Sequence, residues 1–175
     1  MVPMQETTPR FVKAIDSLSE LTGRMVCYLV VFVFGLVVFD VFMRYVLNAP
    51  TVWANEIATY LYGGFAALGG AYTLRYGGHV RVDALYNVLS PRRRALIDVC
   101  TAAGFFLFVA ILVWVGGGRA LSATLKFERS GSFPFNPPLW PFLWVLPVGA
   151  ALMGLQGIAV LVRNIFLAIT GRELQ

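Results

Sequence analysis

The stretch Trp53–Asp83, with the sequence WANEIATYLYGGFAALGGAYTLRYGGHVRVD, contains the features on which the fold depends. From Val52 to Leu74 the only formal charge is Glu56. At a rise of about 1.5 Å per residue, a helix of this length crosses the ~30 Å apolar layer of a bilayer. A carboxylate inside a membrane helix is costly, so Glu56 predicts either a partner or a function at this position.

The composition as a whole is that of an all-α integral membrane protein. The chain is 58% hydrophobic and 13% charged, whereas soluble proteins carry roughly a quarter charged residues. Its apolar runs predict four transmembrane helices in one domain, residues 25–169, together with short amphipathic helices at the interface. The predicted spans are 25–47, 52–76, 95–115 and 139–162, preceded by an amphipathic segment 1–24 and followed by a tail 170–175.

Several function classes are excluded by composition. The chain has one histidine and two cysteines, Cys27 and Cys100, without a C-x-x-C motif, so structural zinc, thiol redox chemistry and bis-histidine haem ligation are not expected. No nucleophile–base pair is visible, so we expect no enzymatic activity and no cofactor in this chain. The net charge of +5 does not indicate nucleic acid, because the basic residues lie beside the apolar runs.

The orientation follows from the distribution of lysine and arginine. With four spans, the N-terminal segment, the second loop and the C-terminal tail share ten of these residues, and the other two loops carry four. Because lysine and arginine are enriched on the cytoplasmic side, both termini are predicted to be cytoplasmic.

Charged residues flank the first predicted hairpin. Asp40 and Arg44 are four residues apart on one helical face, and the short turn at 48–50 brings Glu56 to a similar depth. We therefore predict an intramembrane charge cluster of Asp40, Arg44 and Glu56. Two interpretations are open: the cluster locks the hairpin, alone or against a partner, or it couples transport to an ion or a proton.

Three further features allow more than one interpretation. Gly63, Gly64, Gly69 and Gly70 give the second span a small-residue surface, for close packing within the chain or against an external helix. The predicted cytoplasmic loop carries Arg75, His79, Arg81 and Asp83; His79 with Asp83 is too sparse for a metal site and favours a hydrogen-bonded loop. Gln156, a lone polar group in the fourth span, favours a hydrogen bond between helices.

In this order and spacing, several short motifs resemble the small membrane subunit of the tripartite ATP-independent periplasmic (TRAP) transporters. They are Arg44-Tyr45, Trp53-x-x-Glu56-x-x-x-Tyr60, Gly69-x-x-x-x-x-Arg75, Gly78-His79-Val80-Arg81-Val82-Asp83, Pro138-x-Trp140 and Leu146-Pro147-x-Gly149. Together they cover nearly the whole chain.

The resemblance implies a non-catalytic subunit in the bacterial inner membrane. Such a subunit braces a large multi-span permease, which binds sodium and substrate, and helps dock a periplasmic binding protein that delivers an organic anion such as a carboxylate or sialic acid. The large subunit would then contact Trp53, Tyr60, Gly63, Gly64, Gly69 and Gly70, and the docking loop would carry Arg119, Lys126 and Arg129. Membrane lipids are the other expected partner, without assigned residues. The alternative is a self-sufficient four-helix exporter that exchanges protons for a cation at Glu56.

Overall fold

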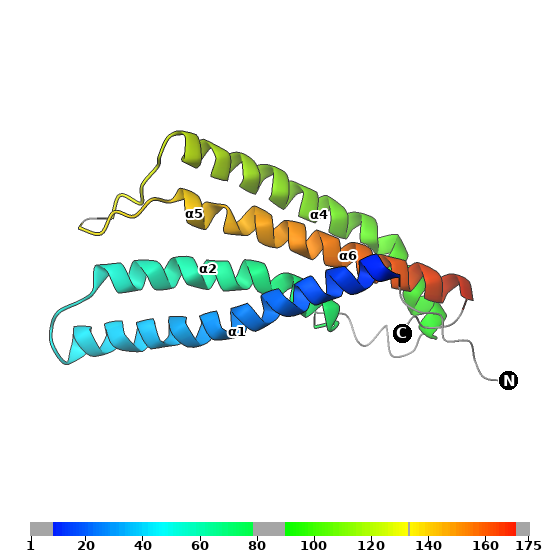
Figure 1. The fold of residues 1–175 in the computed structure, drawn as a ribbon, viewed down its shortest axis with the longest axis horizontal. Helices are drawn as coiled ribbons and strands as arrows, with labels where there is room; N and C mark the ends of the chain where they lie inside the picture. Colours follow the sequence, from blue (N-terminus) through cyan, green and yellow to red (C-terminus); the bar gives the residue numbers. More distant parts are fainter. Residues whose placement is uncertain (1–8, 79–89, 133, 171–175) are drawn as a thin grey trace.

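The computed structural model describes residues 9–78, 90–132 and 134–170, and this part of the chain is helical apart from its connections. Its helices are α1 (Arg10–Tyr45), α2 (Val52–Arg75), α4 (Pro91–Leu125), α5 (Trp140–Leu143) and α6 (Val145–Thr170). The α1–α2 turn and the α4–α5 connection lie at one end of the molecule, called here the hairpin end (Figure 1). The start of α1 and the end of α6 lie at the other, called here the terminal end. The predicted all-α class is confirmed.

Three helical stretches are long and apolar enough to cross a membrane: Arg10–Tyr45, Leu96–Leu125 and Trp140–Thr170. The second predicted span, α2, is not among them. Its 24 residues would reach about 36 Å, but asparagine, glutamate, tyrosine and threonine side chains interrupt its apolar run. Four spans and the orientation of the termini therefore stay predictions.

From Arg10 on, the N-terminal segment and the first predicted span form a single helix, not two elements. The 36 residues of α1 extend about 54 Å, well beyond the ~30 Å apolar layer. The buried face of its first half carries Val12, Ser19 and Gly23, whereas the apolar side chains of Phe11 and Leu21 are exposed. Polar contacts to α2 and α6 help to determine which side of α1 turns inward, and the contact of the amphipathic segment with a membrane or a partner stays a prediction.

Helix α6 is the centre of the array, since it packs against α1, α2 and α4. Small residues permit the closest approaches, as is usual where membrane helices associate. On the α2 side, a Cβ added to Gly149 would lie 2.6 Å from the carbonyl oxygen of Ala67. On the α4 side, a Cβ added to Gly157 would lie 2.3 Å from the ring of Phe105.

Helix α4 continues past the glycine triplet 116–118, where the predicted third span ended, and stops at Leu125. Gly116 is buried, and an added Cβ would lie 3.4 Å from Leu146 and Pro147 at the start of α6. Gly116 therefore provides a close contact inside a helix, although glycine has poor helix propensity. Beyond α4 the connection folds back on itself, with the Ser130 amide donating to Pro137 O and the Leu139 amide to Glu128 O.

Candidate functional site

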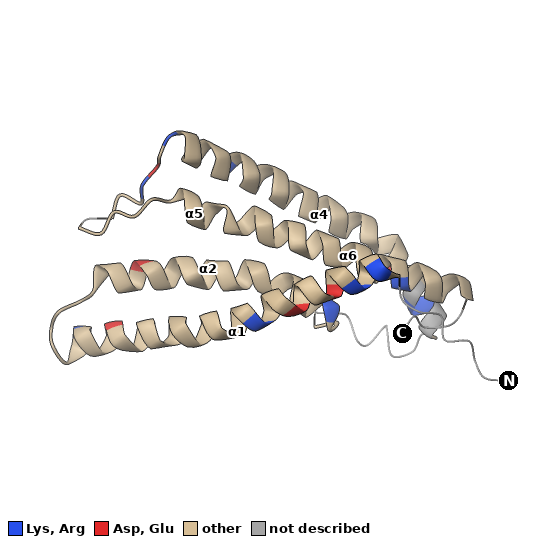
Figure 2. Cartoon of the chain, viewed as in Figure 1, with Lys and Arg blue, Asp and Glu red and all other residues tan. Residues whose placement is uncertain are grey.

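Charged side chains gather at the two ends of the molecule and leave the middle of the helices nearly free of charge (Figure 2). This distribution is expected of a membrane protein, because a charge at the centre of the bilayer is the most expensive. The hairpin end carries Asp40, Arg44 and Glu56, and the terminal end carries a polar network between α1, α2 and α6.

Asp40 joins the end of α1 to the start of α2. Its side chain accepts from the Arg44 guanidinium at 2.7 Å, from the Thr51 hydroxyl at 2.6 Å and from the Thr51 amide at 3.1 Å. The residue is 7% exposed. The turn between them places Asn48 at φ 50, a left-handed conformation that asparagine tolerates well. Asp40 and Arg44 thus form the pair that their spacing allows, and this pair positions the hairpin.

Replacing Asp40 with alanine is expected to lower the thermal unfolding midpoint of the purified protein. The change leaves the Thr51 hydroxyl, the Thr51 amide and Arg44 without their acceptor, and unmade hydrogen bonds are costly where water is scarce. Asp40→Asn should lower the midpoint less, because one oxygen remains for Thr51. An alanine variant that unfolds at the same temperature as the native protein would show that Asp40 does not hold the hairpin.

Glu56 is not part of the Asp40–Arg44 cluster, so the predicted three-residue cluster does not form. The described residues contain no ion pair of Glu56 with Arg44 within 4.0 Å, and Tyr60 instead donates to Glu56 Oε1 at 2.8 Å. The hydroxyls of Ser130 and Ser132, from the α4–α5 connection, lie close to the same carboxylate. Glu56 Oε2 is buried without a well-formed hydrogen bond in the described part of the chain. The carboxylate thus faces the connection and not the first hairpin.

The α4–α5 connection is anchored by an ion pair. Arg119 Nη2 lies 2.6 Å from Glu128 Oε2, and this guanidinium lowers the pKa of the Glu128 carboxyl below its usual 4.5. Arg129 donates to the Asn136 carbonyl at 3.3 Å, and the Gly131 amide donates to the Asn136 side chain at 2.9 Å. Of the three residues predicted for a docking loop, Lys126 and Arg129 are exposed on the connection, and Arg119 lies on α4 shortly before the connection begins.

A polar network at the terminal end was only partly predicted. Gln156, which is 0% exposed, accepts from the Ser19 hydroxyl at 2.7 Å and donates to Asp16 at 3.0 Å. The Arg163 guanidinium forms an ion pair with the same aspartate. Gln156 therefore makes the predicted bond between helices. Asp16 and Arg163 were missed, because a partner 147 positions away leaves no local signal in the sequence.

Arg75 extends this network to α2. Its guanidinium donates to Glu20 at 3.0 Å and to the Asp16 carbonyl at 2.6 Å, and the Tyr76 hydroxyl donates to Glu20 at 2.7 Å. Arg75 was assigned to a loop cluster with His79, Arg81 and Asp83, but its described hydrogen bonds are to α1, and its guanidinium lies over the ring of Tyr76. Those other three residues, and the short helix predicted near them, lie outside the described residues.

Most of the predicted partner surface on α2 is used within the chain. Cβ atoms added to Gly64, Gly69 and Gly70 would meet Val145, Val26 and Met153 at 3.6, 3.8 and 3.1 Å. An added Cβ on Gly63 would meet nothing within 4 Å. The two aromatic residues of this surface differ in the same way. Tyr60 stacks on Phe142 within the chain, with ring centroids 4.4 Å apart, whereas Trp53 is 41% exposed. Of the six residues, Gly63 and Trp53 are the ones with the most accessible surface.

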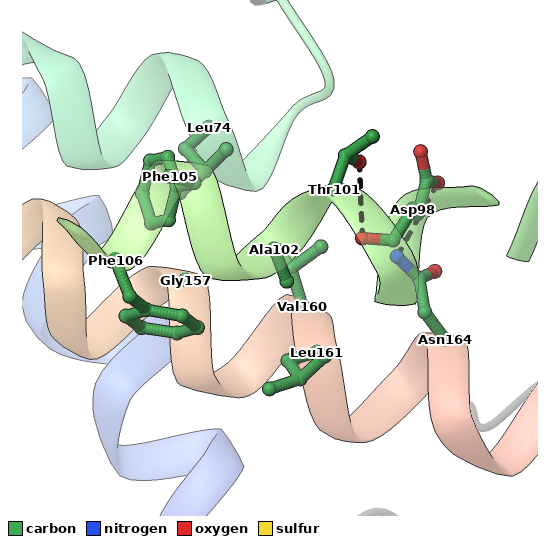
Figure 3. A pocket seen from close by; sticks show the side chains of 10 residues that line it. All are labelled: Leu74, Asp98, Thr101, Ala102, Phe105, Phe106, Gly157, Val160, Leu161 and Asn164. Atoms are coloured by element: carbon green, nitrogen blue, oxygen red, sulfur yellow. Dashed lines mark hydrogen bonds between the residues drawn. The ribbon is translucent and has the colours of Figure 1, made fainter. Parts of the chain in front are cut away.

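A small pocket lies between α2, α4 and α6 near the terminal end, with Leu74 as its α2 residue (Figure 3). Asn164 donates to Asp98 at 3.3 Å at one side of it, and Phe105, Phe106 and Leu161 line the rest. Its volume of about 110 Å³ is far below the 300–1,000 Å³ of a typical ligand site. We assign it no ligand.

The described residues contain no group of three or more histidine, cysteine, aspartate or glutamate side chains that could hold a metal ion. Asp40 contacts Thr51 at the start of α2, Glu56 lies close to the α4–α5 connection, and Gln156 bonds to α1. The arrangement is suited to holding helices and surfaces in place.

Comparisons with known proteins identify the family. The model of the DctQ component of the tripartite ATP-independent periplasmic transporters matches residues 33–167. A C4-dicarboxylate TRAP transporter small permease protein from Rhodobacter capsulatus is 35% identical over 104 residues, 58% of this chain and 44% of the relative. The sialic acid TRAP transporter permease protein SiaT from Haemophilus influenzae is 27% identical over 146 residues, 81% of this chain and 22% of the relative.

The chain therefore spans less than half the length of these curated relatives. The family model, by contrast, extends from the middle of α1 to the last turn of α6 and so includes every described helix in whole or in part. The expected resemblance is confirmed: the chain belongs to the DctQ family, the small permease component of TRAP transporters.

Proposed function

We propose that the chain is the non-catalytic small permease subunit of a TRAP-type secondary transporter. In this role it braces a large multi-span permease subunit in the bacterial inner membrane, with both of its own termini in the cytoplasm. The observation that carries the proposal is the family match, which extends over residues 33–167. It is supported by side-chain chemistry that fixes helices to one another, in place of a set of ion or substrate ligands.

The transported substrate is proposed from the relatives. One of them is a C4-dicarboxylate transporter subunit and another a sialic acid transporter permease, and both substrates are organic anions that carry carboxylates. We propose sodium-coupled uptake of such an anion, with the sodium and substrate sites in the large subunit. A periplasmic binding protein would deliver the anion and dock near the α4–α5 connection, where Lys126 and Arg129 are exposed.

Affinity purification of the tagged chain from its native membrane in mild detergent tests this proposal. We expect a large multi-span protein to accompany the chain in stoichiometric amount, because a brace without its own transport site functions only on a partner. Quantitative mass spectrometry of the eluate measures the ratio. A lone homodimer that catalyses proton-coupled cation efflux in liposomes, with loss of efflux in Glu56→Gln, would contradict the proposal and support the small exporter.

A further inference from the structure

An apolar cavity of about 550 Å³ lies at the hairpin end between α2, α4 and the α5–α6 segment. In Figure 1 the α5–α6 segment runs between α2 and α4. Side chains of this segment line the floor of the cavity. Gly63 and Gly64 contribute the α2 wall, Leu112 and Gly116 the α4 wall, and Phe142 the floor. Arg119 also lines the cavity and is its one charged residue among those described.

The cavity exists because glycine occupies positions where larger residues would fill it. An added Cβ at Gly63 would meet nothing within 4 Å, so this position faces open space. The stacked rings of Tyr60 and Phe142 stiffen the adjoining wall. The space is therefore maintained by the fold, and no side chain among the described residues occupies it.

The volume and the apolar lining of the cavity indicate which class of ligand fits it. A helix about 10 Å across with a 1.5 Å rise fills roughly 120 Å³ per residue, so the cavity holds about one turn of helix and not a spanning helix. The volume lies within the ordinary range for a ligand the size of a drug molecule or an alkyl chain. Since the surroundings are the apolar part of a membrane protein, the abundant ligand of this shape is a lipid acyl chain.

Arg119 gives the cavity a polar rim at the depth of lipid headgroups. It lies four residues after Val115, where the long apolar run of α4 ends, and its side chain is 50% exposed. Trp140 and Trp144 begin the next helical segment at the same end, as aromatic residues do at the membrane interface. One N–H donor of the Arg119 guanidinium pairs with Glu128, which leaves the other donors for an anion. Guanidinium groups bind phosphate in a forked geometry.

We propose that this cavity binds one membrane phospholipid, with an acyl chain between α2 and α4 and the phosphate on Arg119. Because Glu128 already neutralises one side of Arg119, the carboxylate and the lipid phosphate compete for the same guanidinium. The bound lipid therefore links the membrane to the α4–α5 connection, which Glu128 anchors. This site does not depend on the identity of the transported substrate.

The test uses the full-length chain, with any partner that co-purifies, delipidated in detergent. Dioleoylphosphatidylglycerol is titrated in, and native mass spectrometry counts bound lipid. We expect one tight adduct on the native protein. Arg119→Gln should weaken it about tenfold, because a charge-assisted hydrogen bond is lost, and Gly63→Leu should weaken it similarly by filling the cavity.

Two variants serve as controls. In Gly118→Leu a leucine is placed where an added Cβ also meets nothing within 4 Å but which does not line the cavity, so binding should stay unchanged. Glu128→Gln removes the competing carboxylate while Arg119 stays, so the affinity should be retained or rise. A diazirine on the acyl chain of the same lipid should label α2 and α4 peptides near Gly63 and Gly116.

Three results would overturn the proposal. One is equal lipid affinity of Arg119→Gln, Gly63→Leu and Gly118→Leu. The second is an affinity loss in Glu128→Gln as large as in Arg119→Gln, which would show that Arg119 acts only by ordering the connection. The third is acyl-chain label found on a co-purified protein and absent from α2 and α4, which would mean that a partner fills the cavity.

Discussion

Replacing Asp16 with alanine is expected to destabilise the protein by about 2 kcal/mol. The change removes the acceptor of the Arg163 guanidinium and of Gln156 Nε2, and Gln156 is fully buried. A buried donor without a partner costs its desolvation energy, and an ion pair loses more when one member is removed than the pair contributes. Denaturation in detergent with increasing dodecyl sulfate, followed by circular dichroism, measures the loss.

Lys13→Ala is the matched control for this change. Lys13 lies one turn before Asp16 on α1, is exposed, and makes no ion pair within 4.0 Å in the described part of the chain. The double change Asp16→Ala with Arg163→Met should recover part of the lost stability, since it removes both charges together. If Asp16→Ala unfolds like Lys13→Ala, the network does not hold α1 against α6.

Features encoded locally could be predicted from the sequence. The apolar runs predicted an all-α protein because a helix is the simplest way to satisfy backbone groups in lipid. Asp40 and Arg44 were predicted as a pair because four residues make one helical turn. Gln156 was predicted to bond between helices, since a lone amide in an apolar helix has few other partners.

Features that depend on the positions of distant segments could not be predicted. Glu56 was paired with Arg44 on the basis of depth alone, but the α4–α5 connection, more than 70 positions later, brings Ser130 and Ser132 to the same carboxylate. The inward face of the first half of α1 was missed for the same reason. Its burial follows from Asp16 and Ser19, whose partners lie on α6. The spacing of apolar residues along α1 does not indicate polar partners on a distant helix.

The glycines show the same limit in another form. Small residues on α2 were predicted to support close packing, but the sequence does not say which neighbour uses each one. In the structure Gly64 and Gly70 face α6, while Gly63 faces the cavity. The closest approach to backbone atoms of a neighbouring helix is made from the other side, by Gly149 of α6, which the sequence identified as part of a family motif but not as a packing position. Its role follows from the 2.6 Å approach to Ala67 and not from its neighbours in sequence.

Replacing Gly149 with alanine is expected to destabilise the protein, and valine should do so more strongly, by about 2–3 kcal/mol. The added Cβ would lie 2.6 Å from the carbonyl oxygen and 2.7 Å from the carbonyl carbon of Ala67. These are backbone atoms, so no side-chain rotation relieves the clash and α2 must move away from α6. A gap of 0.5–1 Å removes roughly a quarter to a half of the dispersion energy of each contact between α2 and α6.

The sign of the effect separates this contact from helix propensity. Alanine is favoured over glycine by about 1 kcal/mol inside a helix, so propensity alone predicts that Gly149→Ala stabilises the protein. Gly118→Ala, where the added Cβ meets nothing within 4 Å, isolates that contribution and should raise the stability. Opposite signs in the same unfolding assay would therefore attribute the loss at Gly149 to the α2–α6 seam. If Gly149→Ala raised the stability as Gly118→Ala does, α2 and α6 would separate at little cost. Small residues would then not determine how the helices pack.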